Sequence, residues 1–135
     1  MRLDQLKEIN LGEWEGQIQE EIEKKDPERF ESFWKTPHLF KLNSGESFAE
    51  VQNRVLPELK NIVRNHIGTN ILIVTHTVVV KILMAYFEGS ALSDLWNPPY
   101  IHPACLCKVE IEEDKQIICL HGDISHFKQQ IIESY

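Results

Sequence analysis

Residues Asn70 to His76 read NILIVTH, and an apolar run from Val78 to Phe87 follows almost at once. Residues 71–74 are apolar, mostly β-branched and preceded by Asn70, which is typical of a short buried strand. The run from Val78 to Phe87 is long enough for a buried helix, and Gly89 would end it. The sequence therefore predicts a strand that passes directly into a helix.

His76 and Thr77 fall at the switch between the predicted strand and the predicted helix. They would lie at the carboxyl end of a strand and the amino end of a helix, where unpaired N–H groups and the helix dipole favour an anion. Phosphate is the natural ligand to expect there. The alternative is that His76 only caps the turn and takes no part in chemistry, and spacing alone leaves both interpretations open.

Composition limits the kinds of partner. The chain has 135 residues, which predicts one domain over residues 1–135, and its 14 basic and 21 acidic residues give a net charge of −7. This charge disfavours non-specific binding to nucleic acid or to an anionic membrane. The sequence contains no apolar run of about 20 residues, no leader is visible, and the cysteine count is odd, so we expect a cytoplasmic, reduced protein.

Local signals predict the other elements. Ser47-Phe48-Ala49-Glu50 has the form of a capping box, which predicts a helix from Ser47 to about His66 with Pro57 in its interior. Further predicted elements are a charged helix over Gln17 to Lys25, a short helix capped by Asp26 before Pro27, a helical turn over Ser90 to Trp96, and a hairpin of Ala104 to Glu112 with Gln116 to Leu120.

Two groups of side chains have competing interpretations. Phe30, Phe33 and Trp34 share a helical face, which favours packing on the core over a role as the wall of a substrate pocket. The three cysteines, Cys105, Cys107 and Cys119, lack CxxC or HxxxH spacing, so we expect structural thiols and no zinc or other metal.

Two more segments add to the Val74-Thr75-His76 triplet. They are Leu6 to Gly16 (LKEINLGEWEG) and Gly45 to Arg54 (GESFAEVQNR). In this order the three segments resemble the histidine phosphatase superfamily, in its phosphoglycerate-mutase-like branch. Leu95 to Tyr100 and Gly122 to His126 are most similar to broad-specificity phosphatases of the PhoE type.

The resemblance implies a fold and a site. The fold would be a three-layer α/β phosphoglycerate-mutase-like fold with a short mixed sheet made of Ile71 to Val74 and the final hairpin. Glu8 would be the general acid and base, His76 the second pocket histidine that contacts the phosphoryl group, and the N–H of Thr77 part of the same cradle. The resemblance implies no cofactor. The other histidines match no family motif and are expected on the surface or in the core: His38, His66, His102, His121 and His126.

Family members also carry an Arg-His-Gly strand end whose histidine accepts the phosphoryl group, and no such sequence precedes Glu8. We therefore expect a fold truncated at its N-terminus, covering the C-terminal two-thirds of the family fold. Hydrolysis of small phosphate monoesters through a phosphohistidine would be impaired in this chain. The alternative is a non-catalytic remnant that binds inorganic phosphate or another protein. An apolar strand at 71–74 with a free edge would also favour a homodimer.

Overall fold

The structure is a computed structural model that describes residues 1–128, and within them it is an α/β fold with four α-helices and one two-stranded sheet. The α/β class is thus confirmed. The helices are α1 (Gln19–Lys25), α2 (Pro27–Lys35), α3 (Phe48–Asn65) and α4 (Thr77–Glu88), the strands are β1 (Leu106–Glu112) and β2 (Lys115–Asp123), and short 3-10 turns are η1 (Asp4–Leu6), η2 (Gly12–Trp14), η3 (Pro37–Leu39) and η4 (Leu92–Asp94).

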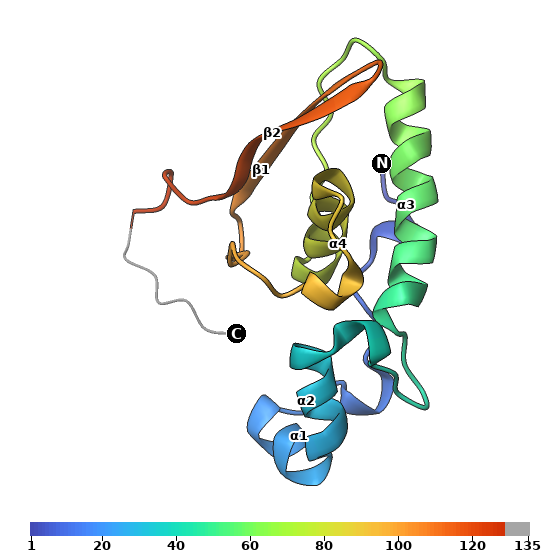
Figure 1. The fold of residues 1–135 in the computed structure, drawn as a ribbon, viewed down its shortest axis with the longest axis vertical. Helices are drawn as coiled ribbons and strands as arrows, with labels where there is room; N and C mark the ends of the chain where they lie inside the picture. Colours follow the sequence, from blue (N-terminus) through green and yellow to red (C-terminus); the bar gives the residue numbers. More distant parts are fainter. Residues whose placement is uncertain (129–135) are drawn as a thin grey trace.

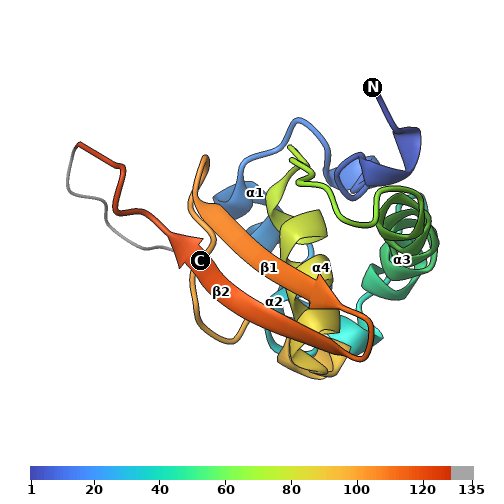
Figure 2. The same cartoon turned by 90° about the horizontal axis from the view of Figure 1, so that it is seen from above.

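Helix α4 occupies the middle of the molecule. It lies between α3 and the β1–β2 hairpin, while α1 and α2 form a separate corner at the opposite end from the hairpin tip (Figures 1 and 2). The turn η1 lies against α3 (Figure 1). This arrangement brings the N-terminal segment and the start of α4 to the same side of the fold.

Helix α3 begins with the predicted capping box. The N–H of Glu50 donates to Ser47 Oγ at 3.1 Å, and the N–H of Ser47 donates to Glu50 Oε2 at 2.8 Å. Each bond satisfies an amide that the helix itself leaves unpaired, and such a cap stabilises a helix by about 1 kcal/mol. The helix continues through Pro57 to Asn65.

Helix α4 is buried over most of its length, as its apolar sequence predicts. Val79 and Ile82 have no exposed surface, and even Lys81 is buried. The helix ends where Gly89 adopts a left-handed conformation, φ 74°, which glycine reaches without the steric cost of a Cβ. The N–H of Ser90 then reaches back to the carbonyl oxygen of Ala85 at 2.9 Å.

Aromatic rings form the part of the core beneath α2. Phe33 lies with its ring centroid 5.1 Å from Phe40, 5.0 Å from Phe48 and 5.4 Å from Trp96, and it is buried. The aromatic stripe of α2 therefore packs on the core through Phe33, as the favoured interpretation predicted. Asp26 precedes α2 as expected, but its side chain makes no cap hydrogen bond and instead contacts Arg29 Nε at 2.6 Å.

The sheet differs from the prediction in one respect. The final hairpin forms with Glu112 paired to Lys115, but residues 71–74 do not join it, so the described sheet is antiparallel and not mixed. The backbone of residues 71–74 makes no hydrogen bond to another described residue. Leu72 and Val74 are 80% and 86% exposed. A strand needs a hydrogen-bonded neighbour for its ladder, and in residues 1–128 no strand is paired with this segment.

Candidate functional site

Glu8 lies at the amino end of α4. The N–H of Val78, in the first turn of the helix, donates to Glu8 Oε2 at 3.1 Å, and the N–H of Ile9 donates to Glu8 Oε1 at 3.0 Å. A carboxylate at this end of a helix is stabilised by the unpaired amides and by the helix dipole. The structure thus brings Glu8 together with His76 and Thr77, which are 68 and 69 positions away in the sequence.

His76 and Thr77 start the helix at the predicted switch. His76 is the N-cap residue, its side chain is exposed, and it makes no cap hydrogen bond, while Thr77 is half-buried. The backbone oxygen of His76 accepts the N–H of Val80 at 2.9 Å. Within the described chain, the N–H groups of Thr77 and Val79 have no acceptor, so two amides remain available for an anion.

The segment that carries Glu8 is held by long-range hydrogen bonds. Thr75 Oγ1 donates to the carbonyl oxygen of Leu6 at 2.6 Å. From α3, Arg54 donates through Nη1 to the carbonyl oxygen of Gln5 at 2.6 Å and through Nη2 to that of Glu8 at 3.1 Å. These bonds fix an irregular segment that belongs to no long helix or strand.

Glu46 extends this network to the following turn. Its carboxylate pairs with Arg54 and also accepts the N–H of Asn10 at 3.0 Å, while its own N–H donates to the carbonyl oxygen of Asn10 at 2.7 Å. The bidentate contact with Arg54 lowers the pKa of Glu46. The two segments approach so closely that a Cβ at Gly45 would lie 2.7 Å from the Asn10 oxygen. Glycine is required there for space.

The sequence identified Glu8, His76 and Thr77 but missed Arg54 and Glu46 as parts of their support. Both residues lie in GESFAEVQNR, and the sequence signal available was opposite charges eight positions apart around a helix start. That spacing predicts neither the carbonyl oxygens that Arg54 contacts nor the amide that Glu46 accepts. These partners lie 36 to 49 positions away in the chain and are defined only by the fold.

Chemically, the start of α4 combines four kinds of group: a carboxylate, an imidazole, two open amides and a half-buried hydroxyl-bearing residue. The amides and the imidazole can hold an anion, and the carboxyl group can give or take a proton.

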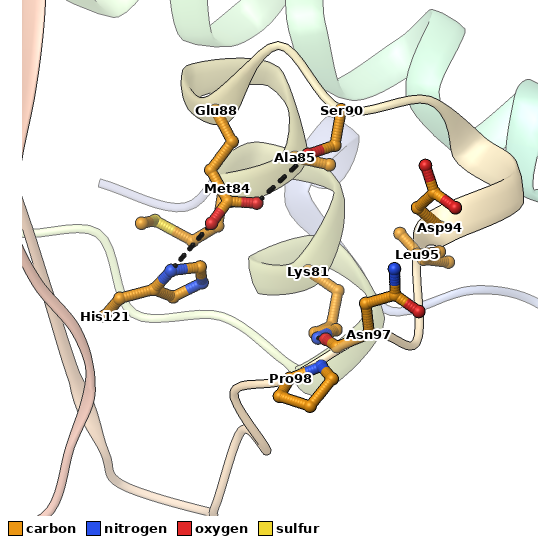
Figure 3. Close-up of a pocket in the computed structure, with 10 residues that line it drawn as sticks. All are labelled: Lys81, Met84, Ala85, Glu88, Ser90, Asp94, Leu95, Asn97, Pro98 and His121. Atoms are coloured by element: carbon orange, nitrogen blue, oxygen red, sulfur yellow. Dashed lines mark hydrogen bonds and ion pairs between the residues drawn. The ribbon is translucent and has the colours of Figure 1, made fainter.

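A separate pocket lies alongside α4 between Lys81 and Glu88 (Figure 3). It encloses a cavity of about 100 Å³ between α4, the loop after it and β2. Glu88 bridges two of its lining residues, with Oε1 3.1 Å from His121 Nδ1 and Oε2 accepting from Ser90 Oγ at 3.2 Å (Figure 3). None of the predicted site residues lines this pocket.

Burial affects the pKa of two basic side chains of this pocket. Burial lowers the pKa of Lys81, whose Nζ donates to the carbonyl oxygens of Asn97 and Pro99 at 2.7 and 3.0 Å. Burial also lowers the pKa of His121; the charge of Lys81 adds to this, and Glu88 opposes it. Lys81 thus connects α4 to the loop at 97–99, and His121 connects it to the hairpin.

The remaining histidines and the cysteines lie outside the Glu8 site. His102 is buried, with neither ring nitrogen bonded to a described residue, whereas His38 and His126 are exposed. Cys105 and Cys107 are half-buried free thiols, and Cys119 is exposed. Within residues 1–128, no three His, Cys, Asp or Glu residues gather as metal ligands would. No described helix is both long and apolar enough to cross a bilayer.

Comparison with known proteins gives one consistent family. The model of the histidine phosphatase superfamily (branch 1) matches residues 2–124. Phosphoserine phosphatase 1 of Hydrogenobacter thermophilus is 29% identical over 132 residues, and a metal-independent phosphoserine phosphatase of Arabidopsis thaliana is 28% identical over 123 residues. The matches cover 98% and 90% of this chain.

Solved structures agree with this relation. YhfR of Bacillus stearothermophilus superimposes with a TM-score of 0.88 at 42% identity, covering 93% of this chain and 62% of that protein. The α-ribazole phosphatase of Shigella flexneri has a TM-score of 0.74 at 20% identity and covers 90% of this chain and 59% of that protein, which supports the fold. The chain spans 62% of the Hydrogenobacter protein and 49% of the Arabidopsis protein.

Proposed function

This chain belongs to the histidine phosphatase superfamily, branch 1, and we propose that it carries the part of a phosphomonoesterase site that contains the acid and the second histidine. The observation that supports this most directly is the contact of Glu8 with the first turn of α4, beside His76. It places a proton-donating side chain next to groups that can bind an anion, although the two are far apart in sequence. These groups, the His76 ring and the N–H groups of Thr77 and Val79, are called the anion cradle below.

In this proposal each site residue has one role. His76 and the N–H of Thr77 hold the phosphoryl oxygens, and Glu8 gives its proton to the departing alkoxide and later takes one from water. The substrate is a small phosphate monoester, in keeping with the phosphoserine and α-ribazole phosphatases among the similar proteins. The N-terminus of α4 accepts the phosphate group through backbone amides, with no need for a metal ion.

We also propose that the 135-residue chain by itself hydrolyses phosphate esters slowly. Its sequence contains no Arg-His-Gly, and none of its other histidines lies in a matching motif. Loss of a covalent nucleophile typically lowers turnover by about 10³-fold or more. Hydrolysis of an aryl phosphate at a rate typical of intact family members, and lost in His76→Ala, would contradict this part of the proposal.

Phosphate binding tests the site directly. Titration of inorganic phosphate should shift the NMR signals of the His76 ring and of the Thr77 and Val79 amides, with weak affinity of about 4 kcal/mol, or millimolar. His76→Ala should weaken these shifts. His38→Ala is the matched control, because His38 is also exposed but belongs to η3 and not to the start of α4. Absence of any shift at the start of α4 would refute phosphate binding.

The exposed segment at 71–74 supports a second proposal, that the chain forms a homodimer. Leu72 and Val74 are largely exposed, and the backbone of this segment is unpaired within the described chain. An extended apolar segment of this kind pairs readily with a second copy, and two antiparallel copies satisfy each other's amides around a two-fold axis. As an interaction protein, the chain would use this surface and need no catalysis.

Sedimentation at micromolar concentration tests the dimer. Leu72→Lys and Val74→Lys should shift the chain to monomer, because each places an ammonium group in an apolar contact. Leu39→Lys is the control, since Leu39 is 69% exposed and lies outside the segment. A monomeric native chain, or a dimer that neither substitution weakens, would contradict pairing through residues 71–74.

A further inference from the structure

Arg54 makes an unusual set of contacts for a half-buried arginine on a helix. Its guanidinium binds the carboxylate of Glu46 through two N–H groups, at 2.8 and 3.0 Å. Its remaining donors reach the backbone oxygens of Gln5 at 2.6 Å and Glu8 at 3.1 Å. The Arg54 side chain thus contacts residues 5–8, which lie 46 to 49 positions earlier in the chain, and Glu46, which lies 8 positions earlier.

The planar guanidinium is suited to this geometry. Its fork of N–H groups can meet a carboxylate on one edge and two carbonyl oxygens on another, whereas the ammonium of lysine is a point charge with three donors on a flexible stem. The Arg54 and Glu46 side chains are each only 24% exposed, so their contact is partly shielded from water. The N–H of Asn10 also donates to Glu46, which fixes the orientation of that carboxylate.

The contacts of Arg54 converge on the residue whose side chain lies at the start of α4. Arg54 holds the main-chain oxygen of Glu8, while the carboxylate of the same residue accepts from Val78 and Ile9. A long acidic side chain loses rotamer freedom when it is fixed in one place. Fixing the backbone of Glu8 restricts the positions that its carboxylate can take.

We propose that Arg54, oriented by Glu46, is a positioning residue that keeps the Glu8 carboxylate against the first turn of α4. This inference rests on the proposed function only in the role assigned to Glu8. Arg54 itself touches no part of the anion cradle. Its action passes through the backbone of residues 5–8, where it binds the carbonyl oxygens of Gln5 and Glu8.

The Val78 amide reports the position of Glu8 without any ligand. Glu8→Gln should move the NMR signal of the Val78 amide, because the amide then donates to a neutral group in place of a carboxylate. In Arg54→Lys the Val78 signal should move away from its native position in the direction seen for Glu8→Gln, while the chain stays folded. Glu46→Gln should give a smaller move in the same direction, because the guanidinium keeps its charge but loses its orienting carboxylate.

Arg64→Lys is the matched control. Arg64 also lies on α3 and its side-chain hydrogen bond is with Asn61 in its own helix, at 3.2 Å, so this variant should leave the Val78 amide signal at its native position. A folded Arg54→Lys or Glu46→Gln with an unchanged Val78 amide signal would overturn the proposal, even if the variant were less stable. Because this experiment is done without phosphate, it tests the positioning role of Arg54 separately from phosphate binding at His76. Either proposal can be contradicted while the other holds.

Discussion

The hydroxyl of Thr75 donates to the carbonyl oxygen of Leu6 at 2.6 Å, joining residues that are 69 positions apart. Thr75 immediately precedes His76, and Leu6 lies two residues before Glu8. The bond therefore connects the two halves of the candidate site directly, in addition to the contact of Arg54 with the Glu8 backbone. Both halves depend on this cross-connection for their relative position.

Thr75→Val should destabilise the fold by about 1 kcal/mol, because the substitution keeps the shape of the side chain but leaves the Leu6 oxygen without its donor. The free energy of unfolding in urea measures the loss. Thr69→Val is the control, since the Thr69 hydroxyl is exposed and binds only the nearby His66 oxygen. Equal effects of the two substitutions would show that the Thr75 hydrogen bond contributes no more to the free energy of unfolding than the local bond of Thr69.

Glu8→Gln should strengthen phosphate binding even as it removes the proposed acid. The substitution removes a negative charge beside the anion cradle, and the interaction of two unit charges at about 4 Å is worth about 1 kcal/mol in water. NMR titration of phosphate would measure the gain. Weaker binding in a folded Glu8→Gln variant would mean that the anion and Glu8 do not share the start of α4.

Phe48→Ala should be the most damaging of these substitutions. The Phe48 ring has no exposed surface and lies among Phe33, Phe40 and Trp96, with centroids 5.0, 5.5 and 5.9 Å away. Removing a buried phenylalanine typically costs about 3–5 kcal/mol. Chemical denaturation should therefore show a large fall in stability, whereas Leu39→Ala, at an exposed position, should change it little.

His121 should make the chain less stable as the pH falls. Burial holds its pKa below the ordinary value, so the unfolded chain binds this proton more readily than the folded chain. The contribution of His121 is therefore complete above the ordinary pKa of histidine and is lost as the pH falls towards the lowered one. The unfolding free energies of the native chain and His121→Gln, compared from about pH 7.5 to about pH 5.5, measure this difference.

The contribution of His121 depends on the charges around it. Glu88 lies 3.1 Å from the ring and favours protonation, while Lys81 disfavours it. Glu88→Gln should therefore enlarge the loss of stability at low pH, since the protonated ring then lacks its counter-charge. A native chain whose stability rises as the pH falls through this range, with the rise absent in His121→Gln, would reverse the assigned direction.

Local signals in the sequence predicted local structure well. The capping box at Ser47, the helix end at Gly89 and the hairpin turn each depend on residues within a few positions of one another, and all are confirmed. Two segments far apart in sequence, around Glu8 and His76, were also expected in one site because of their family resemblance. The structure brings these segments together, while their chemical roles remain proposals.

Interactions that depend on distant neighbours were not predictable in the same way. Residues 71–74 have the composition of a strand, but composition cannot supply the neighbouring backbone that makes an extended segment a strand. Arg54 likewise appeared to be one more charge on a helix. Its importance arises from two carbonyl oxygens, and every residue type presents such an oxygen.

The aromatic cluster beneath α2 has a consequence for optical measurements. The three tryptophans of the chain, Trp14, Trp34 and Trp96, each have a ring in contact with Phe33, so intrinsic fluorescence reports on that corner of the molecule. The tip of the β1–β2 hairpin lies at the opposite end (Figure 1). Opening of the hairpin would leave the emission spectrum nearly unchanged, so a fluorescence melt alone would follow the loss of the aromatic corner and overlook fraying at the other end.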